Sequence, residues 1–223
     1  MSKVTKALDD LIHGYRTFLS EHWAVEAERY RTLAEVGQAP RTLIIACSDS
    51  RVDPSRIFNA RPGELFIVRN VANLVPPFEI HGDYHGTSAA IEFAVRVLQV
   101  ERILVLGHAR CGGIRGFLDG RESHTTPATF LEKWIHLLEP AHRRLLASGL
   151  PEDREARERL MEFTGIAHSI ENLTTFPFVS DAVERGKLQL HGGYFDIATG
   201  QLRLRDPASG AFEQVPACGC SGR

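Results

Sequence analysis

Residues 43–51, Leu-Ile-Ile-Ala-Cys-Ser-Asp-Ser-Arg, decide how the rest of this chain is interpreted. Four apolar residues in succession predict a buried strand over residues 42–46, and polar residues follow directly at its carboxyl end. Open α/β sheets bind their ligands at that end of their strands. Cys47 and the residues just after it are therefore expected to belong to a functional site.

A second apolar run, Ile-Leu-Val-Leu at 103–106, leads into Gly-His-Ala-Arg-Cys-Gly-Gly at 107–113. If the two strands are parallel neighbours, their carboxyl ends lie side by side and bring Cys47, His108 and Cys111 together. Two thiolates and one imidazole suit zinc. Taken singly, His108 and Cys111 fit a core histidine and a structural cysteine better, but two such motifs at two strand ends favour a zinc site. Three protein ligands leave the fourth tetrahedral position open, as in catalytic sites, unless Asp49 fills it.

Asp49 and Arg51 lie two residues apart beyond the first strand. If the backbone stays extended there, their side chains and that of Cys47 point to the same side. The guanidinium would then hold the carboxylate through a forked, charge-assisted pair beside the metal. The alternative is an Asp-Ser turn followed by a surface arginine. Gly112, at the start of the next helix, is expected to present backbone N–H groups to whatever binds at the metal.

The composition is that of an ordinary globular protein. The chain has 223 residues, with 26 Lys and Arg against 28 Asp and Glu and a formal net charge of −2, so no nucleic-acid partner is expected. No apolar run reaches the roughly 20 residues that cross a bilayer, so no membrane association is expected. Residues 1–10 lack the apolar core of a secretory signal, which predicts a cytoplasmic protein. Cys218 and Cys220, near the C-terminus, are expected to be exposed thiols rather than a second metal site.

Alternating strand and helix patterns predict an α/β fold with a central, mainly parallel β-sheet that has an antiparallel edge and is flanked by helices. Residues 3–36 predict two helices, the second capped by Ser20, and residues 88–98 and most of 128–185 also have helical patterns. The expected strands are 42–46, 64–68, 102–106, and a final pair at 188–196 and 201–205. We divide the chain into an N-terminal helical arm (1–37) that packs on a dimer partner, a zinc-binding domain (38–215) and a C-terminal tail (216–223).

Several motifs resemble those of the β-class carbonic anhydrases. They are Cys-Ser-Asp-Ser-Arg-Val at 47–52, Val-Arg-Asn-Val-Ala-Asn-Leu-Val-Pro-Pro at 68–77, Ala-Ile-Glu-Phe-Ala-Val at 90–95, Gly-His-Ala-Arg-Cys-Gly-Gly at 107–113 and His-Gly-Gly-Tyr-Phe-Asp at 191–196. The resemblance covers most of the chain from about 38 to 204. It implies zinc held by Cys47, His108 and Cys111, and reversible hydration of carbon dioxide to bicarbonate by zinc-bound hydroxide. It also implies that Asp49 and Arg51 form a dyad that decides whether the fourth zinc position is open.

The resemblance is to the plant-type members of the family. It implies that Gln38 binds substrate across a dimer interface and that Phe66, Val71 and Phe93 line an apolar pocket, with Gly112 as a further substrate-binding position. Ile44 stands where the bicarbonate-inhibited bacterial subgroup has tryptophan, which favours an open site without cooperative inhibition. A homodimer or larger homo-oligomer is implied. Two alternatives stay open: hydrolysis of carbon disulfide or carbonyl sulfide at the same zinc site, and a non-catalytic zinc-binding module in which Asp49 is a ligand.

Overall fold

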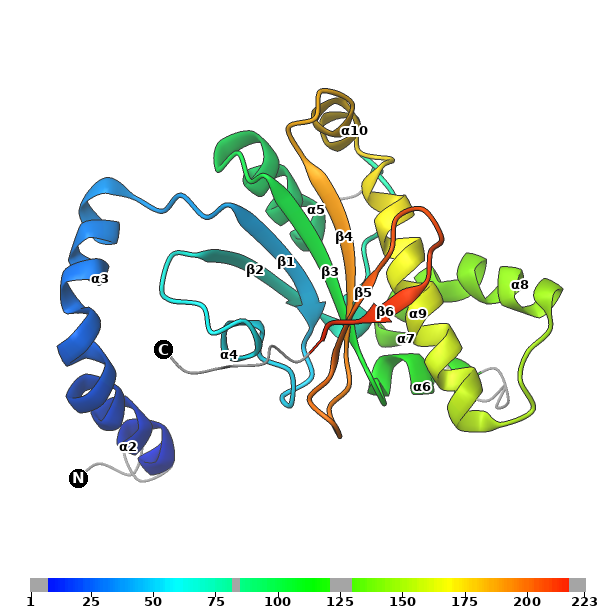
Figure 1. Cartoon of the computed structure of the whole chain (residues 1–223), viewed down its shortest axis with the longest axis horizontal. Helices are drawn as coiled ribbons and strands as arrows, with labels where there is room; N and C mark the ends of the chain where they lie inside the picture. Colours follow the sequence, from blue (N-terminus) through cyan, green and yellow to red (C-terminus); the bar gives the residue numbers. More distant parts are fainter. Residues whose placement is uncertain (1–7, 82–84, 121–129, 217–223) are drawn as a thin grey trace. The chain divides into compact units, whose positions relative to one another are not determined.

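The computed structural model of the chain describes residues 8–81, 85–120 and 130–216, which form two units divided between Ala39 and Pro40 (Figure 1). The N-terminal unit is a run of helix: α2 (Asp9–Thr17), the π-helical segment η1 (Phe18–Trp23) and α3 (Ala24–Val36). The predicted break at Ser20 is wrong. The backbone stays right-handed at Thr17 and Ala24 on either side of η1, and the Ser20 hydroxyl donates to the Thr17 carbonyl within the helix. None of the described residues in α2, η1 and α3 is buried.

The second unit is built on one six-stranded sheet in the order β2-β1-β3-β4-β5-β6. Strands β2, β1, β3 and β4 are parallel, whereas β5 and β6 extend the sheet in antiparallel fashion beyond β4 (Figure 1). This confirms the predicted α/β class with its mainly parallel sheet and antiparallel edge; the sequence analysis did not foresee β6. The strand bounds are Thr42–Cys47 (β1), Leu65–Asn70 (β2), Arg102–His108 (β3), Gln189–Phe195 (β4), Leu202–Arg205 (β5) and Phe212–Gln214 (β6).

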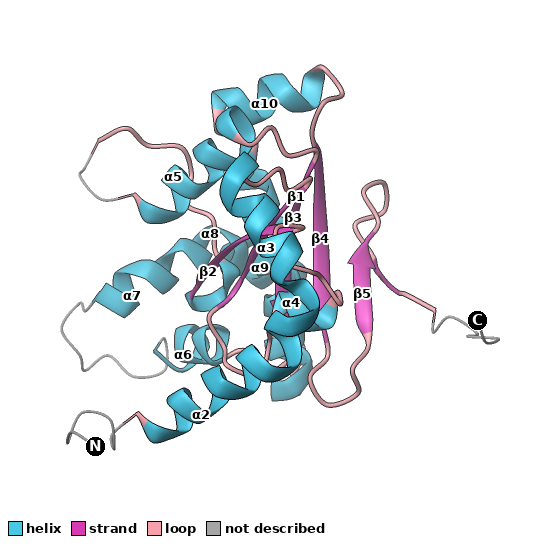
Figure 2. Ribbon diagram, turned by 90° about the vertical axis from the view of Figure 1, so that its left-hand side faces the viewer, coloured by secondary structure: helices cyan, strands magenta, loops and turns pink. Residues whose placement is uncertain are grey.

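Both faces of the parallel strands are apolar, as expected where helices and loops cover them. One face carries Leu43, Ile45 and Val105 and packs against α9 and the helices near it, which Figure 2 shows gathered on one side of the sheet. The opposite face carries Ile44 and Leu106 and is covered by the short helix α4 and the region of β5. The helical segments of this unit are α4 (Pro54–Ile57), η2 (Val71–Asn73), α5 (Gly86–Glu92), η3 (Phe93–Val97), α6 (Gly112–Gly120), α7 (Phe130–Ile135), η4 (His136–Leu138), α8 (Glu139–Ser148), α9 (Arg154–Leu173) and α10 (Pro177–Glu184).

The order of the strands positions the site. β1 and β3 are direct parallel neighbours, with Ala46 opposite Leu106. β1 ends at Cys47 and β3 ends at His108, so both side chains leave the sheet at the same edge. Among the described residues, none of the helices is both long and apolar enough to span a bilayer.

Candidate metal centre

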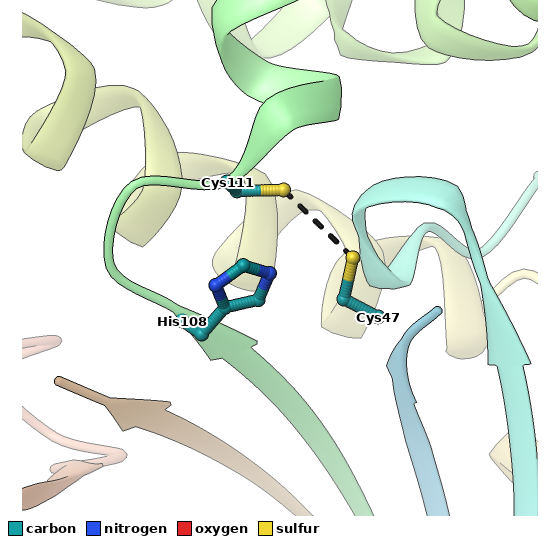
Figure 3. A group of neighbouring side chains, drawn as sticks. All are labelled: Cys47, His108 and Cys111. Atoms are coloured by element: carbon teal, nitrogen blue, oxygen red, sulfur yellow. Dashed lines mark hydrogen bonds between the residues drawn. The ribbon is translucent and has the colours of Figure 1, made fainter. Parts of the chain in front are cut away.

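Three buried side chains converge at the carboxyl edge of the sheet. Cys47 comes from the end of β1, His108 from the end of β3, and Cys111 from the loop that leads into α6 (Figure 3). One ligand atom from each of the three lies within 4.8 Å of the others, and the two sulfur atoms are 3.9 Å apart. The sequence prediction that two neighbouring strand ends would bring these residues together is therefore confirmed.

The imidazole of His108 is oriented as a metal ligand. Its Nδ1 lies 2.9 Å from the carbonyl oxygen of Ala109, and because a carbonyl can only accept, Nδ1 carries the proton in this pair. That tautomer leaves a lone pair on Nε2, on the side of the two sulfurs. Within the described part of the chain, Nε2 is buried and has no hydrogen-bond partner. A buried acceptor without a partner is costly, so its position among thiols is explained if a cation binds there.

The two thiols behave as a coupled pair. Their mutual hydrogen bond lowers the pKa of Cys47 and raises that of Cys111, because one sulfur is stabilised as a thiolate while the other keeps the proton. Burial lowers the pKa of His108, but the neighbouring Cys47 sulfur and the Asp49 carboxylate outweigh burial, and its net shift is upward. A divalent cation would displace these protons, since metal ligands bind in deprotonated form. The donor set fits zinc and, with three donors, leaves one tetrahedral position open.

Asp49 and Arg51 form a close pair beside the cluster. Asp49 Oδ1 accepts from the backbone N–H of Arg51 at 3.0 Å and from its Nε at 2.9 Å, while Oδ2 accepts from Nη2 at 2.7 Å. These hydrogen bonds hold the pKa of the Asp49 carboxyl well below its usual range. Oδ2 also lies 3.8 Å from His108 Nε2, so the carboxylate borders the cluster while it is engaged by Arg51.

The backbone around this pair is not extended, contrary to the condition set in the sequence analysis. The Val52 N–H donates to the Asp49 carbonyl at 3.0 Å, which closes a turn over Ser50 and Arg51. The turn brings the guanidinium back onto the carboxylate two residues earlier. The predicted forked pair between Asp49 and Arg51 is thus present, but it forms across a tight turn and not along an extended backbone.

Arg69 on β2 holds the segment that carries both Cys47 and Asp49. Its Nε donates to the Cys47 carbonyl at 2.9 Å, and its Nη2 donates to the carbonyls of Asp49 at 2.7 Å and Val52 at 2.8 Å. One guanidinium thus donates to three backbone carbonyls of this segment. This role of Arg69 was not predictable from the sequence, because its side chain acts on a segment 17 to 22 residues earlier.

Glu162 on α9 supports the loop of the third ligand, and the sequence analysis also missed it. Its Oε1 accepts from the backbone N–H of Cys111 at 3.0 Å, and its Oε2 accepts from the Tyr194 hydroxyl at 2.8 Å. Burial raises the pKa of Glu162 and likewise that of Tyr194. Helical spacing could have indicated that Glu162 is buried, because Glu158, Glu162 and Ile166 are four residues apart and share the buried face of α9. Glu162 and Tyr194 also line a cavity of about 180 Å³ that borders Arg51.

We expect Glu162→Ala to destabilise the protein by about 1–3 kcal/mol for each buried group that it leaves unpaired, namely the Cys111 N–H and the Tyr194 hydroxyl. Glu162→Gln should cost less, because the amide oxygen still accepts from Cys111. Urea unfolding of zinc-loaded protein measures the difference. Glu155→Ala on the same helix is the matched control, since the Glu155 side chain is 63% exposed and its ion pair with Arg159 contributes little. Equal stability of Glu162→Ala and the control would contradict a supporting role for Glu162.

Comparison with known proteins decides the family. A family model described as carbonic anhydrase matches residues 42–202, which include all three clustered ligands and the Asp49–Arg51 pair. The chain belongs to the carbonic anhydrase family. It is 39% identical over 195 residues to the Arabidopsis thaliana protein "Beta carbonic anhydrase 5, chloroplastic" and 36% identical over 193 residues to "Beta carbonic anhydrase 6, mitochondrial" of the same plant. These matches cover 86% of this chain, but only 63% and 65% of the two relatives.

Solved structures of β-class carbonic anhydrases have the same fold. The structure of the β-carbonic anhydrase CcaA is 31% identical, with a TM-score of 0.85, and the match covers 94% of this chain and all of that one. Coccomyxa β-carbonic anhydrase in complex with acetazolamide is 30% identical, with a TM-score of 0.75, over 88% of this chain and 85% of that one. The resemblance to the β class is therefore confirmed.

The substrate-binding positions implied by the family are only partly brought to the metal centre of one chain. Val71 follows the end of β2, and Gly112 begins α6 next to Cys111. Phe66 and Phe93 contact each other, with ring centroids 5.7 Å apart. However, Phe66 is opposite Leu43, four residues before Cys47, which at about 3.3 Å per residue is roughly 13 Å from the ligand end of β1. Gln38 lies in the N-terminal unit, and its substrate-binding role stays a prediction.

Proposed function

We propose that this chain catalyses the reversible hydration of carbon dioxide to bicarbonate and a proton. The observation that carries the proposal is the unpartnered, buried Nε2 of His108 beside two sulfurs, with the Asp49–Arg51 pair at the edge of the same cluster. Cys47, His108 and Cys111 would hold zinc. When bound, zinc supplies hydroxide near neutral pH, because it lowers the pKa of a coordinated water to about 7.

Asp49 is proposed to orient the nucleophile and Arg51 to fix Asp49. The carboxylate is ionised at all physiological pH values, since Arg51 keeps its pKa low, so it can accept a hydrogen bond but cannot donate one. A fixed acceptor at this place would orient the nucleophile toward the carbon of carbon dioxide by accepting its hydrogen bond. Arg51 also donates to the Arg110 carbonyl at 3.2 Å, which ties the pair to the loop between His108 and Cys111.

A second copy of the chain is proposed to complete the apolar pocket. Phe66 and Phe93 lie far from the metal centre of their own chain, and Phe93 is 42% exposed. β2 forms one end of the sheet, so another chain placed along it could receive these rings. Gln38 would reach the partner's site in the same way. One 30% identical neighbour, from Sordaria macrospora, is described as tetrameric, which supports a homo-oligomer. A cytoplasmic location stays a prediction.

The decisive experiment is stopped-flow hydration of carbon dioxide by purified protein, combined with a metal count. We expect about one zinc per chain and rapid hydration that a chelator abolishes and zinc restores. Zinc without hydration would indicate a non-catalytic module, and turnover of carbonyl sulfide or carbon disulfide in its place would indicate the alternative hydrolase. Either result would overturn the proposed activity.

Hydration rates are expected to show no cooperative inhibition by bicarbonate. The resemblance implies that Ile44, buried on β1 at 1% exposure, stands where the inhibited subgroup has tryptophan. Initial rates measured over a bicarbonate series at constant pH and ionic strength test this. A steep, sigmoidal loss of activity would place the chain in the inhibited subgroup.

A further inference from the structure

The segment between β2 and α5 makes an unusual turn next to the metal centre. Ala72 and Asn73 both have left-handed backbone conformations, with φ of 63° and 49°. Such conformations are unfavourable for alanine and persist only where the surroundings enforce them. Both residues are buried, at 1% and 5% exposure. Something other than local preference must therefore hold this turn.

Side chains from distant parts of the chain hold it. The carbonyls of the turn and the residues around it accept hydrogen bonds from side-chain donors rather than from a regular ladder. These bonds are Trp134 Nε1 to Val71 O (2.8 Å), Ser169 Oγ to Asn73 O (3.3 Å), Asn70 Nδ2 to Leu74 O (2.8 Å) and Asn172 Nδ2 to Val75 O (2.8 Å). Trp134 is the donor from α7, and its acceptor directly precedes the first left-handed residue.

The residue that Trp134 holds packs at the start of α6, two residues from the ligand Cys111. A Cβ added at Gly113 would lie 2.8 Å from Val71 Cγ1 and 2.9 Å from Ala72 Cβ, so Val71 packs directly on the start of α6. Gly113 is two residues beyond Cys111, and its backbone N–H lowers the pKa of that thiol. Trp134 packs against the same apolar cluster that contains Cys47, Ala72 and Cys111. Val71 is 37% exposed, so the surrounding protein leaves part of this residue uncovered.

We propose that Trp134 is a positioning residue that fixes Val71 as the apolar wall on which carbon dioxide is held beside the metal. This inference rests on the proposed function. The indole N–H fixes the orientation of the peptide group between Val71 and Ala72, and that orientation sets the direction of the isopropyl group. A wall made by one small side chain has to be fixed, because carbon dioxide has no charge and no hydrogen-bond donor, and contact with the wall contributes to its alignment.

Trp134→Phe tests this by removing the N–H and keeping a ring. We expect KM for carbon dioxide to rise about fivefold, the effect of one ordinary hydrogen bond. The kcat, the zinc content and the pH profile should stay near those of the parent protein. Phe130→Leu is the control on the same helix, since Phe130 is 97% exposed. A fall in kcat or in zinc content with unchanged KM would overturn the positioning role in favour of a general structural one.

Val71→Ala and the double variant Trp134→Phe/Val71→Ala complete a double-mutant cycle, which measures whether the two residues affect KM independently. If Trp134 acts through Val71, the second substitution should add almost nothing to KM once the first is present. Additive effects on KM would overturn the inference, as would an unchanged KM in Val71→Ala.

Hydrogen exchange of the backbone amides of residues 70–75 gives a readout that needs no activity. Exchange should accelerate in Trp134→Phe and not in Phe130→Leu, and equal protection in both would overturn the contact. If the parent protein fails to hydrate carbon dioxide, the proposed function fails, while the exchange experiment still decides whether Trp134 holds the turn.

Discussion

Cys47→Ser is expected to lose most of its zinc. The serine hydroxyl does not ionise near neutral pH, so only His108 and Cys111 would remain as donors, and two donors do not make a stable tetrahedral site. The loss of affinity should exceed the roughly 10–100-fold that follows removal of an outer-shell partner. The orphaned His108 Nε2 and the remaining thiol would stay buried without a cation. Zinc per chain, measured by atomic emission after dialysis, should fall well below one, and carbon dioxide hydration should fall with it.

The matched control is the double variant Cys218→Ser/Cys220→Ser, which makes the same chemical change at two thiols. These cysteines, expected from the sequence to be an exposed pair, lie outside the residues that the structure describes. The control should keep one zinc per chain and full activity. If the control lost its zinc and Cys47→Ser kept it, the metal would be at the C-terminus and the proposed centre would be wrong.

Asp49→Ala is expected to keep its zinc and lose turnover by about 10²-fold or more, as is typical when a fixed acid–base or orienting group is removed. Zinc should remain because the clustered ligand atoms come from Cys47, His108 and Cys111. Turnover should fall because the alanine cannot accept the hydrogen bond that aligns the nucleophile. Stopped-flow kinetics and a metal count on the same sample separate the two effects.

Two further variants test whether the loss of turnover in Asp49→Ala comes from the lost carboxylate. Ser50→Ala, at the exposed residue between the pair, should leave both quantities unchanged. Asp49→Asn keeps the shape of the side chain but loses its charge, so Arg51 would no longer be held by a forked ion pair. Its activity should be close to that of Asp49→Ala. Normal hydration in either Asp49 variant would remove the pair from the mechanism, whereas loss of zinc would make Asp49 a ligand.

The clustering of Cys47, His108 and Cys111, and the edge of the sheet where they meet, could be predicted from the sequence alone. Apolar runs of four residues followed by polar residues are typical of buried strands, and parallel neighbours align their carboxyl ends. Cys47 and His108 were therefore predictable, and Cys111 followed because three residues in a strand-to-helix loop let it reach the same point. The family motifs added the reaction and the expected role of Asp49 and Arg51. These inferences depend only on the spacing of residues within short motifs, and that spacing can be read from the sequence.

Only the tertiary structure decided how the ligands are supported. Arg69 reaches back to the Cys47–Val52 segment, Glu162 accepts from Cys111 51 residues away, and Trp134 donates to Val71 from 63 residues further along. No sequence spacing predicts such bonds, because they depend on which elements pack side by side. The turn at Asp49 and the continuous helix through Ser20 differ from these cases, because the hydrogen bonds seen there join residues only three positions apart. The pairing of β1 with β2 also decided where Phe66 lies. It is opposite Leu43, and because each strand residue adds about 3.3 Å, the four residues from Leu43 to Cys47 separate Phe66 from the metal centre.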